Sequence, residues 1–498
     1  TNGVRQRVRT LVETPNEKNP YLQQVPGVVR RAGRDLEKAW LSNLRDLNVC
    51  SQKGLGERFD ATIGAASVLM PFGGKYQLTP AEAMVAKIPV RTGATNTASA
   101  MAFGFDPDLS TWSPFHGAVY AIVEAASKIV ATGGNPQQIR LTLQEYFEHL
   151  GTDPKKWGKP FAALLGALYA QHALGMPAIG GKDSMSGTFE DLNVPPTLVA
   201  FAVAPVRADE VISPEFKFPA NRVVMIPVPR DAQDLPVFPR LNKNFEKIYQ
   251  LIAGQKAFSA QTVGKGGIAA ALSKMCLGNN LGFKFKAFIP QDDLFKPLYG
   301  TVLLEVASTL DIPKELAGTG AVELGETRDV PSIITDLDTI VLSDVKAAYT
   351  EPLEKIFPTT VPQTVRQIDR PTYAPYTSGR PLSRAVKIAR PRVLIPVFPG
   401  TNCEYDSARA WERVGAVPEI LVVRNLTPQA VEETVHAIAA ALRQTQILML
   451  PGGFSGGDEP GGSGKFIAAM FRAPEIAEGV QRLLRDQDGL ILGICNGF

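Results

Sequence analysis

One cysteine of this chain stands in a setting that suits a nucleophile. Cys495 is the central residue of the sequence GICNG at 493–497, and an apolar run precedes it. Glycines on both sides of a nucleophile allow a sharp turn that lifts its side chain above the edge of a sheet. A thiolate in that position can attack an acyl carbon. We therefore predict that Cys495 is a catalytic nucleophile. The alternative is a buried and inert thiol, which is the usual state of a free cysteine.

Two backbone N–H groups are candidates to stabilise the oxyanion that such an attack produces. Gly453 belongs to the Gly-rich sequence PGGFSGGD at 451–458, and Asn496 directly follows the nucleophile. Backbone donors that are already oriented toward a developing negative charge accelerate acyl transfer. The sequence therefore predicts that Gly453 and Asn496 donate to the oxyanion. Cys403 is a rival nucleophile, but its loop lacks the flanking glycines.

The elements around these loops alternate between strand and helix. Apolar runs typical of strands lie at 393–398, 419–423, 446–450 and 489–494, and amphipathic runs typical of helices lie at 407–414, 428–442 and 464–484. This alternation predicts a parallel, doubly wound α/β sheet over residues 392–498. Sites in such sheets lie at the carboxyl ends of the strands, which is where the Gly-rich loops and Cys495 are found.

The upstream sequence predicts two α+β subdomains, at 49–215 and 216–343, because strand-like and helix-like runs are segregated there. Residues 1–48 are charged and hold one helical run. We interpret them as a linker or helical tail of an upstream domain. Residues 344–391 are rich in proline, which fixes φ, so we expect an extended interdomain linker there.

The composition excludes several classes of protein. The 498 residues are 45% hydrophobic and 20% charged, and 52 Lys and Arg side chains balance 49 Asp and Glu. This balance argues against a nucleic acid or a membrane surface as partner. No apolar stretch is long enough to span a bilayer. The four cysteines are widely spaced, so we predict no cysteine metal site, and we expect a cytoplasmic protein.

The motifs around the candidate nucleophile resemble a known family. The sequences GICNGF at 493–498, GGFS at 452–455 and PGTNC at 399–403 are similar to the class I glutamine amidotransferase domain of phosphoribosylformylglycinamidine synthase. The resemblance implies a flavodoxin-like glutaminase that uses a Cys–His–Glu triad and passes ammonia to a synthetase. It gives Cys495 the role of nucleophile. The family's His and Glu follow this elbow, so we expect a missing C-terminal segment and an incomplete domain at 392–498.

A second group of motifs resembles the synthetase part of the same family. The sequences FGGK at 72–75, WSPFHG at 112–117, VEA at 123–125, GGKDSMS at 180–186 and PPTL at 195–198 are similar to the second of two synthetase-type repeats in the large, single-chain form. The resemblance implies an aminoimidazole-ribonucleotide-synthetase-like fold for the repeat. It also implies a first repeat, expected before Thr1, which holds the substrate and the catalytic ATP with Mg²⁺.

The activity implied by both resemblances is an ATP-dependent amidoligase reaction of purine synthesis. Formylglycinamide ribonucleotide, glutamine and ATP are converted into formylglycinamidine ribonucleotide, glutamate, ADP and phosphate. We expect this chain to be inactive without its missing segments. The alternatives are a non-catalytic scaffold with a degenerate glutaminase, and an isolated cysteine hydrolase of the same fold. The synthetase-like region argues against the isolated hydrolase.

The repeat departs from the family pattern at an auxiliary nucleotide and Mg²⁺ site. Glu124 is kept, but Lys128 stands where the family has Asn, and the loop TVGKGG at 262–267 has no carboxylate. Mg²⁺ prefers anionic oxygen ligands, so we expect neither metal nor tightly bound cofactor here. The residues that we assign to this degenerate site are Lys75, Glu124, Lys128, Gly264 and Lys265.

Two arrangements of these lysines are open. Their ammonium groups can act as counter-charges for phosphate. Alternatively, Lys128 pairs with Glu124 at i, i+4 on one helix face and fills a vacated pocket. We favour the pair, because the loss of every carboxylate except Glu124 indicates loss of the site.

Overall fold

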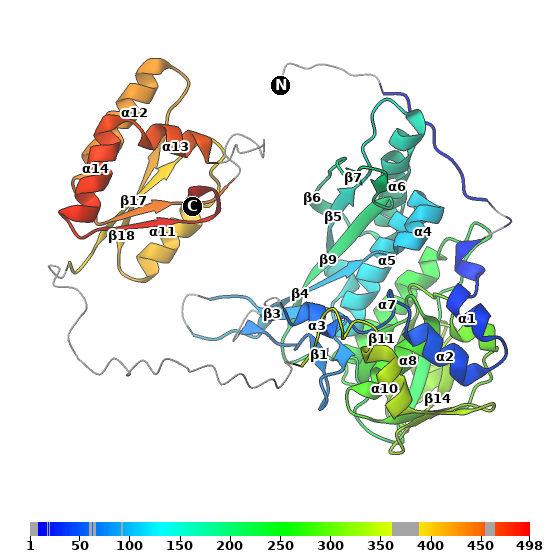
Figure 1. Cartoon of the computed structure of the whole chain (residues 1–498). Coiled ribbons are helices and arrows are strands. Elements are labelled where there is room, and N and C mark those ends of the chain that lie inside the picture. Colours follow the sequence, from blue (N-terminus) through cyan, green and yellow to red (C-terminus); the bar gives the residue numbers. More distant parts are fainter. Residues whose placement is uncertain are drawn as a thin grey trace. The chain divides into compact units, whose positions relative to one another are not determined.

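The computed structural model describes residues 8–360, 388–453 and 464–498, apart from 17, 19, 59–61, 63–65 and 91–92. Its contacts divide the chain into two compact units, Thr1–Thr364 and Val365–Phe498. The first unit contains two large sheets and the second contains one (Figure 1). The predicted combination of α+β and α/β parts is confirmed.

The first sheet of the first unit has the order β3-β4-β9-β5-β6. Its strands are β3 (Met84–Lys87), β4 (Thr97–Gly104), β5 (Arg140–Tyr146), β6 (Ala178–Lys182) and β9 (Thr197–Arg207). Residues along β4 and β9 alternate between buried and more exposed positions, because successive side chains of a strand point to opposite faces. The buried face packs on helix α5 (Pro114–Thr132), which in turn contacts α6 (Pro154–Leu174).

Local signals fix both ends of α5. The Ser113 hydroxyl accepts a hydrogen bond from the backbone N–H of His116 at the amino end, and Pro114 takes the first helical position. Gly133 ends the helix with a φ of 107°, a conformation that glycine adopts without strain. Residues next to each end of the helix therefore set its limits.

The second sheet has the order β11-β13-β10-β14-β12-β15-β16. Its strands are β10 (Arg222–Ile226), β11 (Ala257–Thr262), β12 (Gly282–Phe285), β13 (Val302–Val306), β14 (Val322–Arg328), β15 (Ser332–Ile334) and β16 (Thr339–Val341). Helices α7 (Phe238–Ala253), α8 (Gly267–Leu277) and α10 (Leu342–Thr350) pack around it. The strands of the two sheets come from the two predicted subdomains, and one hydrophobic core extends across both.

Short elements complete the first unit. They are η1 (Tyr21–Gln23), α1 (Gly27–Ala32), α2 (Leu36–Leu44), α3 (Lys53–Gly56), β1 (Phe72–Gly73), β2 (Thr79–Pro80), α4 (Pro107–Trp112), η3 (Pro136–Gln138), β7 (Thr188–Phe189), β8 (Leu192–Asn193), η4 (Gln291–Leu294) and α9 (Ile312–Glu315).

The structure differs from the expected domain limits at two places. The helices within residues 1–48 belong to the first unit, because Trp40 of α2 is fully buried and donates through Nε1 to Ser273 of α8, at 2.8 Å. The first residues of the expected linker at 344–391 are helical instead. Helix α10 crosses its start and buries Val345 and Tyr349, and residues 361–387 lie outside the described residues.

The second unit is the predicted doubly wound sheet. Its four strands are all parallel in the order β18-β17-β19-β20. The elements are β17 (Arg392–Val397), α11 (Glu404–Arg413), β18 (Val417–Val422), α12 (Pro428–Leu442), β19 (Ile447–Leu450), α13 (Lys465–Phe471), α14 (Pro474–Arg485), β20 (Leu490–Gly493) and η5 (Cys495–Gly497). One face of the sheet packs on α11 and the other on α12, α13 and α14.

The predicted helix at 464–484 is two helices. Pro474 starts the second of them, because proline cannot donate a backbone hydrogen bond and disfavours a helical residue before it. None of the helices in the described part of the chain has the length and apolar character that a bilayer crossing requires.

Candidate functional site

Cys495 lies in a strained turn at the carboxyl end of β20. Its φ is 53°, a left-handed conformation that is uncommon for residues other than glycine and is found at functional turns. The backbone N–H of Ile494 donates to the carbonyl of Leu450 at 3.0 Å, which ties the turn to β19. The side chain of Cys495 is exposed. This is the geometry that the flanking glycines predict for a nucleophile.

The double glycine after β19 faces this thiol. A Cβ atom on Gly452 would lie 3.1 Å from the Cβ of Cys495 and 3.8 Å from its Sγ. Gly453 has a φ of 151°, and a Cβ there would lie 2.5 Å from the carbonyl oxygen of Gly400. Side chains at these positions would therefore crowd the nucleophile or the neighbouring loop.

Three loops meet at this edge of the sheet. The Asn496 side-chain amide donates to the carbonyl oxygen of Gly453, and Thr401, in the loop after β17, forms a β-bridge with Gly453. The structure thus brings together the three residues that the sequence assigns to one site, namely Cys495, Gly453 and Asn496. The carboxyl ends of parallel strands are the expected place for such a site.

The rival cysteine lies in a relaxed conformation. Cys403 precedes α11 with a φ of −112°, and its Sγ donates to Oδ1 of Asn402 at 3.1 Å. It therefore lacks the strained turn that presents Cys495.

The histidine of the second unit has a partner on a neighbouring helix. His436 of α12 lies with Nδ1 2.8 Å from Oε2 of Glu475 on α14, and both side chains are exposed. The two helices pack on each other. We therefore assign this pair to the packing of α12 on α14 rather than to proton transfer.

Three residues of the predicted auxiliary site also come together in the first unit. Lys128 and Glu124 of α5 form an ion pair of 2.9 Å. The Lys128 ammonium also donates to the carbonyl of Phe103 at 2.9 Å. A Cβ on Gly264 would lie 3.6 Å from Oε1 of Glu124. The favoured arrangement, a Glu124–Lys128 pair, is the one that this structure has.

The other two predicted lysines have other partners. Lys265 pairs with Asp108 and lies 3.6 Å from Oδ1 of Asp106. The Lys75 ammonium lies over the ring of Tyr76, 5.6 Å from its centre. These partners are a carboxylate pair and an aromatic ring, so neither contact joins its lysine to the Glu124–Lys128 pair.

Two charged residues that act on this pair were not predicted from the sequence. Glu82 follows β2, and its carboxylate accepts from Thr262 Oγ1 of β11 at 2.6 Å and from Gln261 Nε2. Lys274 lies on α8, whose other residues are all buried. Lys274 could have been noticed in the sequence, because it is the one charged residue of a helix that is otherwise mostly apolar. A cation in such a place needs a negative partner. Nothing in the spacing of Glu82 marked it.

The residues at this place do not fit Mg²⁺ with a nucleotide. An ammonium group already lies against Glu124, a second lysine acts on the same carboxylates, and the loop after β11 offers no carboxylate. Among the described residues, no group of three or more His, Cys, Asp and Glu side chains is arranged to hold a metal ion.

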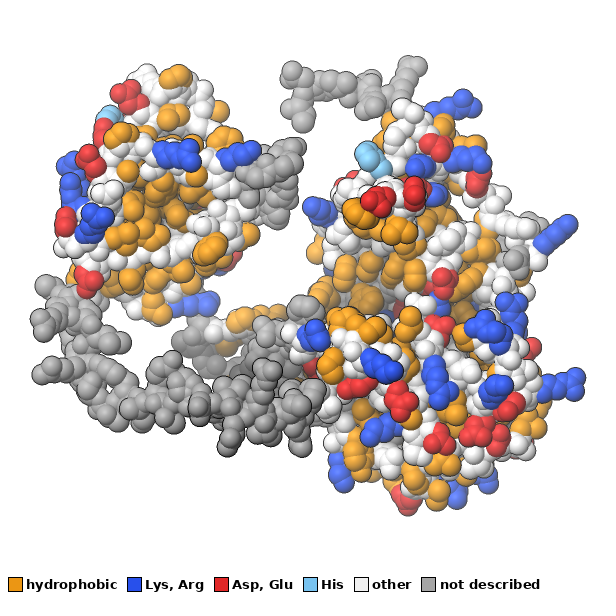
Figure 2. Space-filling view, in the orientation of Figure 1, with side chains coloured by type: hydrophobic (Ala, Val, Ile, Leu, Met, Phe, Trp, Pro, Cys, Tyr) orange, Lys and Arg blue, Asp and Glu red, His pale blue; other side chains and the backbone are white. Residues whose placement is uncertain are grey.

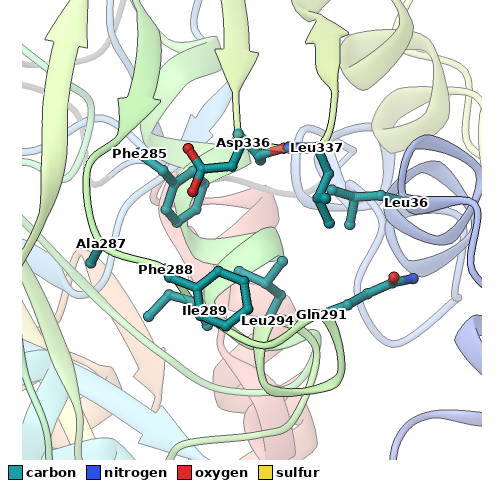
Figure 3. Close-up of a pocket in the computed structure, with 10 residues that line it drawn as sticks. Leu36, Phe285, Ala287, Phe288, Ile289, Gln291, Leu294, Asp336 and Leu337 are labelled. Atoms are coloured by element: carbon teal, nitrogen blue, oxygen red, sulfur yellow. The ribbon is translucent and has the colours of Figure 1, made fainter.

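A surface pocket lies beside α2 and the end of β12 (Figure 3). Its lining is mostly apolar and includes Leu36, Phe285, Phe288 and Leu294, with Asp336 as its charged side chain. Its lining has no cysteine, histidine or lysine, so we assign it no part in the chemistry.

Comparisons with known proteins agree with both sets of motifs. Residues 390–498 match the family model of the CobB/CobQ-like glutamine amidotransferase domain. The PurQ subunit of phosphoribosylformylglycinamidine synthase from Sulfurimonas denitrificans is 37% identical over 109 residues, 22% of this chain and 39% of that protein. The PurL subunit of the same enzyme from Pyrobaculum aerophilum is 25% identical over 293 residues, 54% of this chain and 39% of that protein. The chain is a relative of the phosphoribosylformylglycinamidine synthases.

The predicted resemblance is thereby confirmed for both parts, a PurL-like synthetase region and a glutaminase domain. Among solved structures, the chain is similar to Thermotoga maritima PurL complexed with FGAR, with a TM-score of 0.46 and 14% identity, over 66% of this chain and 55% of that one. The chain spans 39% of the length of each curated relative named above.

Proposed function

We propose that this chain carries the glutaminase nucleophile and the non-catalytic synthetase repeat of a phosphoribosylformylglycinamidine synthase of the cytoplasm. The complete enzyme would use ATP to convert formylglycinamide ribonucleotide and glutamine into formylglycinamidine ribonucleotide and glutamate, with release of ADP and phosphate. The observation that carries the proposal is the exposed Cys495 at a φ of 53°, opposite the double glycine.

The first half of the chemistry is an acyl transfer to sulfur. The Cys495 thiolate attacks the carboxamide carbon of glutamine, a C–S bond forms, and the carbonyl electrons move onto oxygen. The backbone N–H groups of Gly453 and Asn496 would stabilise this oxyanion. The C–N bond then breaks, and the nitrogen leaves as ammonia after it takes a proton.

The second half restores the thiol. Water attacks the thioester, the C–S bond breaks, and glutamate leaves while the thiolate of Cys495 returns. Both halves need a general acid and base. In this proposal they come from a histidine held by a glutamate outside these 498 residues, as in the family that the elbow resembles.

One face of the first sheet has exposed apolar side chains of the kind that contact another protein domain. Met101 and Phe103 of β4 are 38% and 56% exposed, and they pair across the ladder with Val203 and Phe201 of β9. Hydrophobic side chains gather over these strands in Figure 2. Contiguous apolar surface of this kind marks an interaction site. We propose that the matching sheet of a first synthetase repeat, which binds the ribonucleotide and ATP with Mg²⁺, covers it.

The test uses the enzyme assembled with the segments that the proposal requires. A glutamine-mimicking diazo ketone should label Cys495. Cys495→Ala should abolish glutamine-dependent synthesis and retain synthesis from added ammonia, while Cys403→Ala should retain both. Label on Cys403, or full glutaminase activity of Cys495→Ala, would contradict the proposal. Loss of both activities in Cys495→Ala would exclude independent glutaminase and synthetase sites.

A further inference from the structure

Four charged side chains act on one another electrostatically where the two subdomains of the first unit join, and two of them, Glu124 and Lys128, are in contact. Glu124 and Lys128 come from α5 of the first subdomain, Glu82 precedes β3, and Lys274 comes from α8 of the second subdomain. Their charges act on one another. Two carboxylates and two ammonium groups balance, so the cluster carries no net charge.

The carboxylates are held by groups from both subdomains. Glu82 accepts from Thr262 and Gln261 of β11, and Glu124 accepts at Oε2 from the backbone N–H of Phe105 at 3.2 Å. The side chains of Lys128 and Glu124 are 17% and 15% exposed. A charged side chain that is largely buried is destabilising unless it is paired and hydrogen-bonded. Glu124 has both an ion pair and a hydrogen bond, and Glu82 has two hydrogen bonds.

The titration behaviour agrees with this arrangement. Burial opposes the charge of Lys128, yet the carboxylates of Glu124 and Glu82 raise the pKa of its ammonium above the usual value. Burial raises the pKa of the Glu82 carboxyl, although Lys128 opposes the shift. Burial lowers the pKa of Lys274. Lys128 contacts Glu124 directly and acts on Glu82 more strongly than Lys274 does.

We propose that this cluster is a permanent electrostatic junction between the two subdomains that needs neither metal nor nucleotide. Lys128 and Lys274 supply from within the chain the positive charge that Mg²⁺ supplies at the auxiliary site of the repeats that this region resembles. A divalent cation would add charge to a balanced cluster and would have to displace Lys128 from Glu124. The phosphates of a nucleotide would meet two carboxylates. The inference does not rest on the proposed glutaminase function.

A first experiment asks whether the junction takes a ligand. The thermal unfolding temperature of the 498-residue chain is measured with Mg²⁺ alone and with ATP and Mg²⁺, beside Glu124→Ala. We expect the difference in unfolding temperature between the unsubstituted chain and Glu124→Ala to be the same with and without each addition. A rise in the unfolding temperature of the unsubstituted chain that saturates with ligand and disappears in Glu124→Ala would overturn the proposal.

A second experiment asks whether Lys128 is the internal cation. Lys128→Met keeps the length of the side chain but leaves two buried carboxylates short of a cation, so we expect the unfolding temperature to fall by about 5 °C or more. Lys286→Met is the control, because Lys286 makes an ion pair of 3.0 Å with Glu326 at a side-chain exposure of 48%. Its effect should be within about 2 °C.

The double variant Glu124→Gln/Lys128→Met keeps the test decisive if Lys128→Met fails to fold. It removes both charges of the pair, and the Gln side chain can still accept from the backbone N–H of Phe105. We therefore expect the double variant to fold, with an unfolding temperature close to that of the unsubstituted chain. A Lys128→Met variant as stable as Lys286→Met would overturn the proposal. So would a double variant that is less stable than Lys128→Met.

Discussion

The side-chain amide of Asn496 donates a hydrogen bond to the carbonyl oxygen of Gly453, so the residue after the candidate nucleophile holds the loop that faces it. Gly453 has a φ of 151°, which the β-bridge with Thr401 supports from the other side. These two contacts hold Gly453 from both sides, and the N–H that the proposed function needs as an oxyanion donor belongs to the neighbouring Gly452–Gly453 peptide. Preorganised donors stabilise a transition state because they need not reorient as charge develops.

The first prediction concerns this side chain. Asn496→Leu keeps the backbone N–H but loses the bond to Gly453, so we expect kcat for glutamine hydrolysis in the assembled enzyme to fall about 10–100-fold, with a smaller change in KM. Steady-state glutamate release measures it. Asn496→Gln, which retains an amide donor, should recover part of the rate. An unchanged kcat in Asn496→Leu would show that the bond has no part in positioning the donor.

The second prediction concerns the space in front of the thiol. Gly452→Ala places a methyl group 3.1 Å from the Cβ of Cys495, which is closer than nearly all contacts of that kind. We expect alkylation of Cys495 by a glutamine-mimicking chloroketone to slow at least about tenfold. Gly464→Ala is the matched control, since nothing lies within 4 Å of a Cβ there. Equal rates for the two variants would contradict a crowded nucleophile.

The third prediction ranks the two lysines of the junction. Burial lowers the pKa of Lys274, whereas the carboxylates raise that of Lys128. Lys128 therefore holds its proton more strongly than Lys274 does. Lys274→Met should lower the unfolding temperature of the first unit less than Lys128→Met does. The reverse order would mean that Lys274 is the main counter-charge of Glu82.

The second unit was predictable because each of its signals is local. Apolar runs alternate with amphipathic helices, and the pattern around Cys495 specifies a sharp turn by spacing alone. The division of the predicted helix at 464–484 into two was also readable from the sequence, because Pro474 starts the second helix. Asn496 was predicted through its backbone, but its side-chain bond to Gly453 depends on two loops from different strands.

The junction of the first unit was only partly predictable. The spacing of Glu124 and Lys128 puts them on one helix face, so the pair followed from the sequence. Glu82 and Lys274 are 192 residues apart in the sequence, and the packing of α8 on β2 and β11 brings their charges within range of each other. The burial of Trp40 against Ser273 is equally non-local, which is why residues 1–48 were assigned to another domain.

The fourth prediction concerns a carboxyl group buried in the first sheet. Glu145 of β5 is 5% exposed, and its Oε1 has no hydrogen-bond partner within the described part of the chain. Burial first, and the charge of Asp183 second, raise the pKa of Glu145 from 4.5 to about 7. The folded protein therefore keeps a proton on Glu145 that the unfolded chain releases.

The sign of the pH effect follows from this difference. Because the folded pKa is the higher one, the protonated carboxyl contributes fully below about pH 4.5, and the contribution is lost as the pH rises through about 7. At about 1.4 kcal/mol per pKa unit, the loss is about 3 kcal/mol. Glu145→Gln has no proton to lose, so it should be more stable than the unsubstituted chain at pH 8 and nearly equal to it at pH 5. Urea unfolding at the two pH values measures the difference, and Asp183→Asn should give a smaller gain. A Glu145→Gln variant that is less stable at pH 8 would show that the ionised carboxylate is bound by a partner.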